Sequence, residues 1–195
     1  MASGAELLGV LLGSFILNLI PFAGPSNLLI ASNAALLVNT DPFTLGFLVA
    51  LGSASAKFIH YVVTFFVGGL LSEQRRKRLN EVNLKVGKWA FLALFIVSAT
   101  PIPDEPVIIP LGLMKYNPAK FCLAIFLGKI LITTLGAYLG QFGQGALSSL
   151  ITQEALIALS IILTIAITII LLKIDITKIA QKIQKTITKQ KRQNP

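Results

Sequence analysis

Four charged side chains stand inside strongly apolar stretches of this 195-residue sequence. Lys57 and Lys129 interrupt two long apolar runs, and Asp104 and Glu105 occupy a proline-rich break. If the runs are membrane helices, Lys57 lies about 22 Å and Lys129 about 16 Å beyond the proline that precedes each run. The two carboxylates follow about 18 Å of helix, so all four charges are expected near the midplane. An unrelieved charge there costs on the order of 3 kcal/mol, so these charges must be paired, neutralised or hydrated.

This arrangement indicates a transport site for an anionic headgroup such as a phosphate. Helices that begin just after Pro25 and Pro106 would present unpaired N–H groups and a positive dipole end at mid-depth. Burial favours the protonated form of a carboxyl group, so Asp104 and Glu105 are the expected proton-coupling or gating residues. The expected substrate-binding residues are Lys57, Lys129, Ser26 and Asn27.

A structural interpretation of the same residues also stands. Lys57 would pair with one carboxylate and so lock two hairpins together. Asp104 would cap the helix that begins near Pro106, with Glu105 beside the N-terminal dipole.

The composition excludes several other classes of protein. Apolar residues make up 54% and charged residues only 13% of the chain, whereas a soluble domain carries about a quarter charged residues. The net charge of +9 therefore indicates contact with a membrane surface and not with nucleic acid. With one His and one Cys, neither a metal site nor another cofactor is expected. No Ser/His/Asp set or phosphate loop indicates an enzyme.

The apolar pattern predicts an all-α, polytopic membrane protein. The runs at 43–71 and 119–147 are long enough to cross a bilayer. The stretches at 5–20 and 88–99 are too short to cross, and each leads into a proline-rich break, which is typical of a re-entrant hairpin. The hairpin breaks contain Pro21, Pro25, Pro101, Pro103 and Pro106.

The short helix, broken hairpin and long span occur twice. Pro42 and Gly52 in the first half match Pro118 and Gly128 in the second half at the same spacing. The sequence therefore predicts one membrane domain at 1–174, with repeat one at 5–71, repeat two at 85–147 and a last span at 152–174. A basic amphipathic tail is expected at 175–195.

The basic residues predict the orientation in a cell membrane. They are concentrated in a basic loop at 72–88 and in the tail, so both are expected on the cytoplasmic side and the N-terminus outside. The two repeats are then inverted, as in many secondary transporters. The tail is expected to lie on the anionic inner leaflet, with a soluble partner helix as the alternative. The GxxxG spacings at Gly9/Gly13 and Gly136/Gly140 indicate helix packing and permit a homodimer.

Residues 10–147 resemble the DedA family, whose shared region is also called the SNARE-associated or VTT domain. The resemblance rests on the run Pro101-Ile-Pro-Asp-Glu-Pro106 and on the segments that flank it. Those segments are Pro21-Phe-Ala-Gly-Pro25, Gly52, Tyr61, Pro110-Leu-Gly-Leu-Met114, Pro118-Ala-Lys-Phe121, Gly128 and Tyr138. Small YqaA-like or archaeal members are the most similar. The resemblance implies two facing re-entrant hairpins and the movement of lipid by scrambling or proton-coupled flipping.

The expected function is therefore a transporter that moves an anionic lipid, either a polyprenyl-phosphate carrier or a phospholipid, between leaflets. Its expected partners are membrane lipids. Two alternatives remain at this point: a transporter of a small soluble ion or osmolyte, and a non-transporting scaffold that shapes membranes through its tail.

Overall fold

The computed structural model describes residues 2–21, 24–147 and 162. The all-helical prediction is confirmed over this part of the chain, which contains helices and no strands. Apart from Ile162, the predicted last span at 152–174 lies outside the described residues, as does the tail at 175–195. The helices are α1 (Gly4–Leu19), α2 (Asn27–Leu37), α3 (Pro42–Gly69), α4 (Glu73–Ser98), α5 (Glu105–Leu113) and α6 (Pro118–Leu147).

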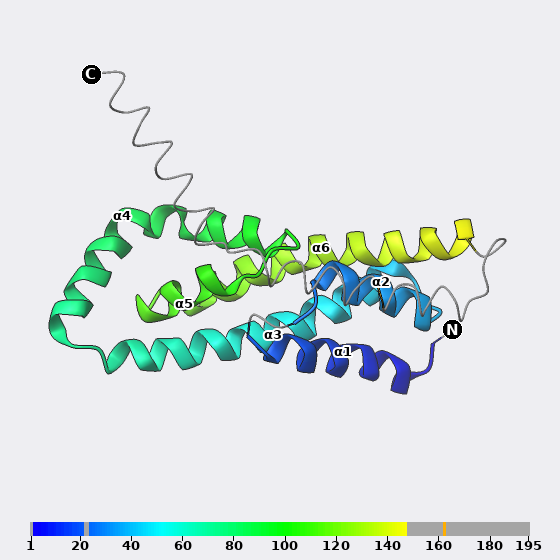
Figure 1. Ribbon diagram of the computed structural model, residues 1–195, viewed down its shortest axis with the longest axis horizontal. Helices are drawn as coiled ribbons and strands as arrows, with labels where there is room; N and C mark the ends of the chain where they lie inside the picture. The colour runs from blue at the N-terminus through cyan, green and yellow to red at the C-terminus, as the bar shows by residue number, and fades with distance from the viewer. Residues whose placement is uncertain (1, 22–23, 148–161, 163–195) are drawn as a thin grey trace, which may run out of the picture.

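Two of these helices, α3 and α6, are long and apolar enough to cross a membrane. They pack against each other through the middle of the molecule (Figure 1). The α1–α2 hairpin lies at one end of this pair, and the C-terminal half of α4 forms a second hairpin with α5 at the other end (Figure 1). The turns of both hairpins point toward the centre, so the two proline-rich breaks lie close together.

The first helix of one hairpin and the second helix of the other pack on the same long helix. In the first hairpin, α1 packs along α3 and α2 along α6. In the second, α4 packs along α6 and α5 along α3. Each hairpin therefore connects both long helices, and its turn is held over the place where they cross.

The long helices begin in the same way. Asp41 accepts a hydrogen bond from the Thr44 amide at 2.7 Å, and Asn117 accepts one from the Lys120 amide at 3.0 Å. The Thr44 hydrogen bond lowers the pKa of the Asp41 carboxyl. A proline occupies the first helical position in both cases, where its missing N–H has no cost.

The basic segment at 72–88 is helical, so the prediction of a loop there is wrong. Helix α4 begins at Glu73, directly after Ser72, and continues to Ser98. Lys, Arg, Glu and Leu all have high helix propensity, and they dominate this segment.

Glycines allow α2 and α6 to touch backbone to backbone. A Cβ atom built on Gly136 would lie 2.3 Å from the Leu28 carbonyl oxygen, and one on Gly140 would lie 2.4 Å from that of Ser32. The GxxxG pair at Gly136/Gly140 therefore serves packing within the chain. A Cβ on Gly9 or Gly13 would instead meet nothing within 4 Å among the described residues.

This contact gives a stability prediction. Gly140→Ala must push α2 away from α6 and is expected to destabilise the fold by about 1–3 kcal/mol, the usual cost of overpacking. Thermal unfolding in detergent measures the change. Gly143→Ala on the same helix is the matched control, because its Cβ would meet no atom within 4 Å. Equal melting temperatures for the two variants would contradict the packing assignment.

Large apolar side chains remain exposed around the outside of the bundle. Four of them are more than 65% exposed: Phe66, Leu70, Trp89 and Phe142. A soluble monomer rarely exposes so much apolar surface, whereas a lipid-facing surface requires it. The exterior therefore matches a helical membrane protein.

Candidate functional site

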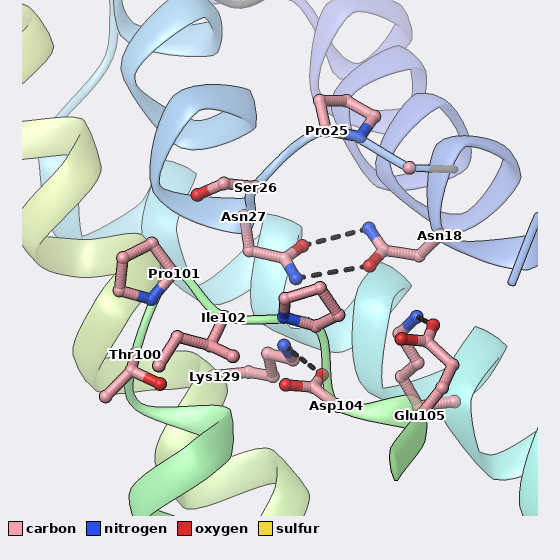
Figure 2. A pocket seen from close by; sticks show the side chains of 13 residues that line it. Asn18, Pro25, Ser26, Asn27, Thr100, Pro101, Ile102, Asp104, Glu105 and Lys129 are labelled. Atoms are coloured by element: carbon pink, nitrogen blue, oxygen red, sulfur yellow. Dashed lines mark hydrogen bonds and ion pairs between the residues drawn. The ribbon is translucent and has the colours of Figure 1, made fainter. Parts of the chain in front are cut away.

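The two hairpin turns face each other across a small polar cavity of about 40 Å³ (Figure 2). Its walls come from the end of α1, both proline-rich breaks and the middle of both long helices. The lining residues are Asn18, Gly24, Pro25, Ser26, Asn27, Lys57, Thr100, Pro101, Ile102, Pro103, Asp104, Glu105 and Lys129. That space holds about three water molecules. It is far smaller than the roughly 300–1,000 Å³ of a typical ligand pocket.

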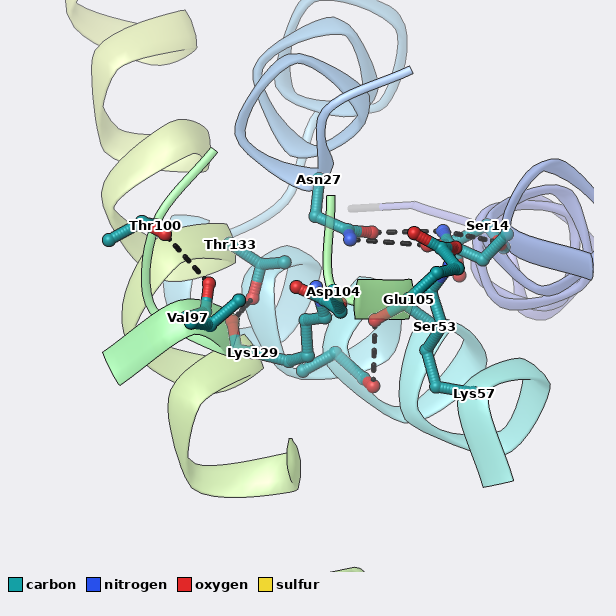
Figure 3. Close-up of polar contacts among 12 residues, drawn as sticks. Ser14, Asn27, Ser53, Lys57, Val97, Thr100, Asp104, Glu105, Lys129 and Thr133 are labelled. Atoms are coloured by element: carbon teal, nitrogen blue, oxygen red, sulfur yellow. Dashed lines mark hydrogen bonds and ion pairs between the residues drawn. The ribbon is translucent and has the colours of Figure 1, made fainter. Parts of the chain in front are cut away.

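The four charges predicted at mid-depth converge on this cavity as two ion pairs. Lys57 Nζ on α3 lies 2.5 Å from Glu105 Oε1, and Lys129 Nζ on α6 contacts Asp104 Oδ2. Lys57 is 6% exposed, and each of the other three residues is 2% exposed. The second hairpin is thus joined to both long helices by adjacent residues. Figure 3 shows these side chains together with Asn27 of the first hairpin.

The two ion pairs differ in how well their carboxylates are satisfied. The Lys57 ammonium donates a hydrogen bond to Glu105. The contact between Lys129 and Asp104 lacks hydrogen-bond geometry, and Asp104 Oδ1 is buried with no hydrogen-bond partner among the described residues. Burying an unsatisfied carboxylate oxygen is costly, so a water molecule or a ligand donor at Oδ1 would stabilise the buried Asp104 side chain.

The structural interpretation of Asp104 as a helix cap is not supported. Asp104 does hold the N-cap position of α5, but its side chain makes no capping hydrogen bond. Its backbone at φ −86° and ψ −19° lies in the helical region, whereas a capping residue usually has extended backbone. The carboxylate turns toward the cavity and Lys129 (Figure 2).

A reciprocal pair of amides closes the first hairpin at the same depth. Asn18 Nδ2 donates to Asn27 Oδ1 at 2.9 Å, and Asn27 Nδ2 donates to Asn18 Oδ1 at 3.1 Å. Asn18 also donates to the Ser14 carbonyl at 2.9 Å. Both amides are buried, and this bidentate contact fixes the start of α2 against the end of α1 (Figure 2).

Ser26 occupies the N-cap position of α2 without capping it. Its side chain makes no capping hydrogen bond, and its hydroxyl oxygen is buried without a hydrogen-bond partner among the described residues. Figure 2 places Ser26 beside the cavity, opposite the second hairpin. The cavity is therefore lined from one side by an unpartnered hydroxyl and from the other by an unpartnered carboxylate oxygen.

A threonine braces the two long helices next to Lys129. The Thr133 hydroxyl lies 2.7 Å from the Gly46 carbonyl on α3 and 2.6 Å from the Lys129 carbonyl, and its single proton is shared between these two acceptors. Its hydroxyl is fully buried. This contact fixes the turn of α6 that carries Lys129 (Figure 3).

The structure thus brings together all six residues predicted to bind substrate or to couple protons. Three of the predicted breaks, Pro25, Pro101 and Pro103, also line the cavity. Pro21 lies at the end of α1 and Pro106 in the first turn of α5, outside the cavity lining. Within the described ranges, no cluster of three or more His, Cys, Asp or Glu side chains could hold a metal ion.

Asn18 is not among the site residues predicted from the sequence, although Asn27 offers a signal that could have identified it. Asn18 is the one amide side chain in the apolar stretch at 5–20, three residues before Pro21. A buried amide needs a hydrogen-bond partner, and Asn27 begins the helix on the far side of the same break. That rule would have paired the two.

The comparison with family models gives one match. The sequence model of the VTT domain matches residues 20–142, which covers both proline-rich breaks, all of α3 and most of α6. No curated protein and no solved structure gives a significant match.

Proposed function

Because the chain belongs to the VTT-domain (DedA, SNARE-associated) family of membrane proteins, we propose that it moves an anionic lipid between the leaflets of a membrane. The lipid would be a polyprenyl phosphate or a phospholipid, moved by flipping or scrambling. The observation that carries the proposal is the pair of buried ion pairs at the meeting point of two broken hairpins. Buried intramembrane charges mark substrate or ion pathways more often than they serve packing.

In the proposed membrane placement, α3 and α6 cross the bilayer and the two hairpins are re-entrant from opposite sides. The exchanged docking of the hairpins on α3 and α6 supports an inverted repeat. Equivalent glycines support it as well. A Cβ on Gly52 would meet the α1 backbone at Leu11, and one on Gly128 would meet the α4 backbone at Phe95. The basic residues then orient the chain, with the N-terminus outside and the tail on the anionic inner leaflet.

The proposed transport cycle exchanges carboxylate for phosphate as the partner of the lysines. In the state seen here, each ammonium is paired with a carboxylate, so the site is electrically balanced. Protonation of Asp104 and Glu105 would leave two positive charges. A phosphate monoester supplies two compensating negative charges and a phosphodiester supplies one, and the N-termini of α2 and α5 supply backbone donors. Proton binding and headgroup binding would thus favour each other.

Entry of a headgroup requires the hairpins to separate. The cavity of about 40 Å³ admits water but no lipid headgroup. Among the described helices, neither α1 nor α2 packs extensively against α4 or α5, so each hairpin is held mainly by α3 and α6. A rocking motion of one hairpin against the other would therefore open the cavity while α3 and α6 stay packed, as in transporters built from inverted repeats.

The proposal is tested with the purified full-length chain in proteoliposomes. A fluorescent phosphatidylglycerol is placed in both leaflets, and an impermeant reductant quenches the fluorophores of the outer leaflet. Wild-type protein is expected to expose the inner-leaflet lipid to the reductant, and faster at acidic than at neutral pH. Empty liposomes are the control. A pH-dependent flux of a soluble anion without lipid movement would instead identify a soluble-ion transporter. If phosphatidylglycerol, a polyprenyl phosphate and a soluble anion all fail to move, the scaffold is favoured.

A further inference from the structure

A second, larger hollow lies between α1 and α2, on the outside of the bundle. It has a volume of about 460 Å³, more than ten times that of the polar cavity. Its walls are almost entirely apolar, with Val10 and Leu17 on α1 facing Ile30 and Leu37 on α2. Glu6 is the one charged residue in its lining, and it lies at the end far from the hairpin turn.

Two glycines on α1 keep this groove open. Gly9 and Gly13 both line it, and a Cβ on either would meet no atom of the described residues within 4 Å. Gly136 and Gly140 on α6 differ from this pair, because a Cβ on either would lie less than 2.5 Å from the backbone of α2. Among the described residues, Gly9 and Gly13 thus widen a groove and bring no helix into contact.

The groove and the polar cavity meet at Pro25, which lines both. From Leu17 beside the turn to Glu6 at the far end, the groove follows about 16 Å of helix. That length matches one leaflet, which is half of a hydrocarbon core of about 30 Å. The apolar groove would therefore begin beside a phosphate bound in the cavity and extend over the depth of one leaflet.

We infer that the groove between α1 and α2 holds the hydrocarbon chain of the lipid whose anionic headgroup enters the polar cavity. This inference rests on the proposed function and adds a site for the lipid tail. A hydrocarbon chain has no polar groups to satisfy, which fits walls made of aliphatic side chains. Two of the side chains that line the groove, Leu17 and Leu37, are themselves among the exposed large apolar residues, so the groove is continuous with the lipid-facing surface.

A photoactivatable lipid tests the inference. Phosphatidylglycerol with a diazirine on one acyl chain is reconstituted with the full-length protein, irradiated, and its adduct mapped by mass spectrometry. The wild-type adduct is expected in the segments 6–17 and 25–38. In Gly13→Leu, labelling of these segments is expected to fall about fivefold or more, because the added side chain overpacks the groove. Gly143→Leu is the matched control and should keep wild-type labelling, since Gly143 also faces open space but lies on α6.

Two results would overturn the inference. One is equal labelling of α1 and α2 in Gly13→Leu and Gly143→Leu. The other is a wild-type dimer that Gly13→Leu dissociates, because that would make a second copy of the chain the occupant. The readout does not require transport. Labelling that follows the prediction in protein that moves no lipid would overturn the proposed function and leave the tail site standing.

Discussion

Lys129→Met is expected to destabilise the protein severely, by about 3–5 kcal/mol, because it leaves the buried Asp104 carboxylate without its partner. The double variant Lys129→Met with Asp104→Asn is expected to regain most of this loss. Replacement of a buried ion pair by neutral groups of similar size is often close to neutral for stability. Thermal unfolding in detergent, followed by size-exclusion chromatography of the heated sample, measures both effects.

Lys120→Met is the matched control for this experiment. It makes the same substitution on the same helix, but Lys120 is exposed near the start of α6. A change within about 0.5 kcal/mol is expected there. Equal melting temperatures for Lys129→Met, Lys120→Met and the wild type would show that Asp104 and Lys129 form no buried ion pair. The proposed exchange of carboxylate for phosphate would then lose its basis.

Cross-linking the two hairpin turns is expected to abolish lipid movement. Ser26 and Ile102 line the cavity from opposite hairpins, and a headgroup cannot enter until those hairpins separate. Ser26→Cys and Ile102→Cys are introduced together with Cys122→Ala, which removes the exposed native thiol. A flexible bifunctional thiol reagent should stop transport in the double-cysteine protein, and a reductant that cleaves the link should restore it.

The two single-cysteine proteins control for modification without a link. Because Ser26 is a proposed headgroup-binding residue, modification there is expected to slow transport by itself, so the link must slow transport further than either single modification does. Unchanged transport in the cross-linked double-cysteine protein would show that the hairpins need not separate. The headgroup would then follow a path that avoids the cavity.

The positions of the buried charges could be predicted from sequence because the bilayer penalises them so strongly. A Lys in the middle of a long apolar run has few acceptable locations, and prolines mark where a short helix must end. Those two rules placed Lys57, Lys129, Asp104 and Glu105 around one point, and the structure gathers them there. Both rules concern how far along a helix a residue lies, and that distance follows directly from the residue numbers.

The pairing of the charges could not be predicted. Asp104 and Glu105 are adjacent in the chain, so either could have faced either lysine. The choice depends on how α5 is rotated over α3, which is set by contacts such as the close approach of Gly112 to Thr64. Contacts of this kind join residues far apart in the sequence, and no local pattern encodes them.

The basic segment before the second hairpin shows a different limit. The positive-inside rule predicts which side of the membrane the basic segment at 72–88 occupies. It says nothing about whether that segment is a loop or a helix. The Lys, Arg, Glu and Leu residues of the segment form helix readily in water, and α4 begins there at Glu73.

The most direct test of the account compares lipid movement by wild-type protein with that by the Lys129→Met/Asp104→Asn double variant in the same proteoliposome assay. Both proteins are expected to be folded, so the comparison isolates the role of the charges. The account predicts that the wild type moves the fluorescent phosphatidylglycerol, that Lys120→Met does so equally well, and that the double variant does not. Lipid movement at the wild-type rate by the folded double variant would contradict it and make the Asp104–Lys129 pair a purely structural contact.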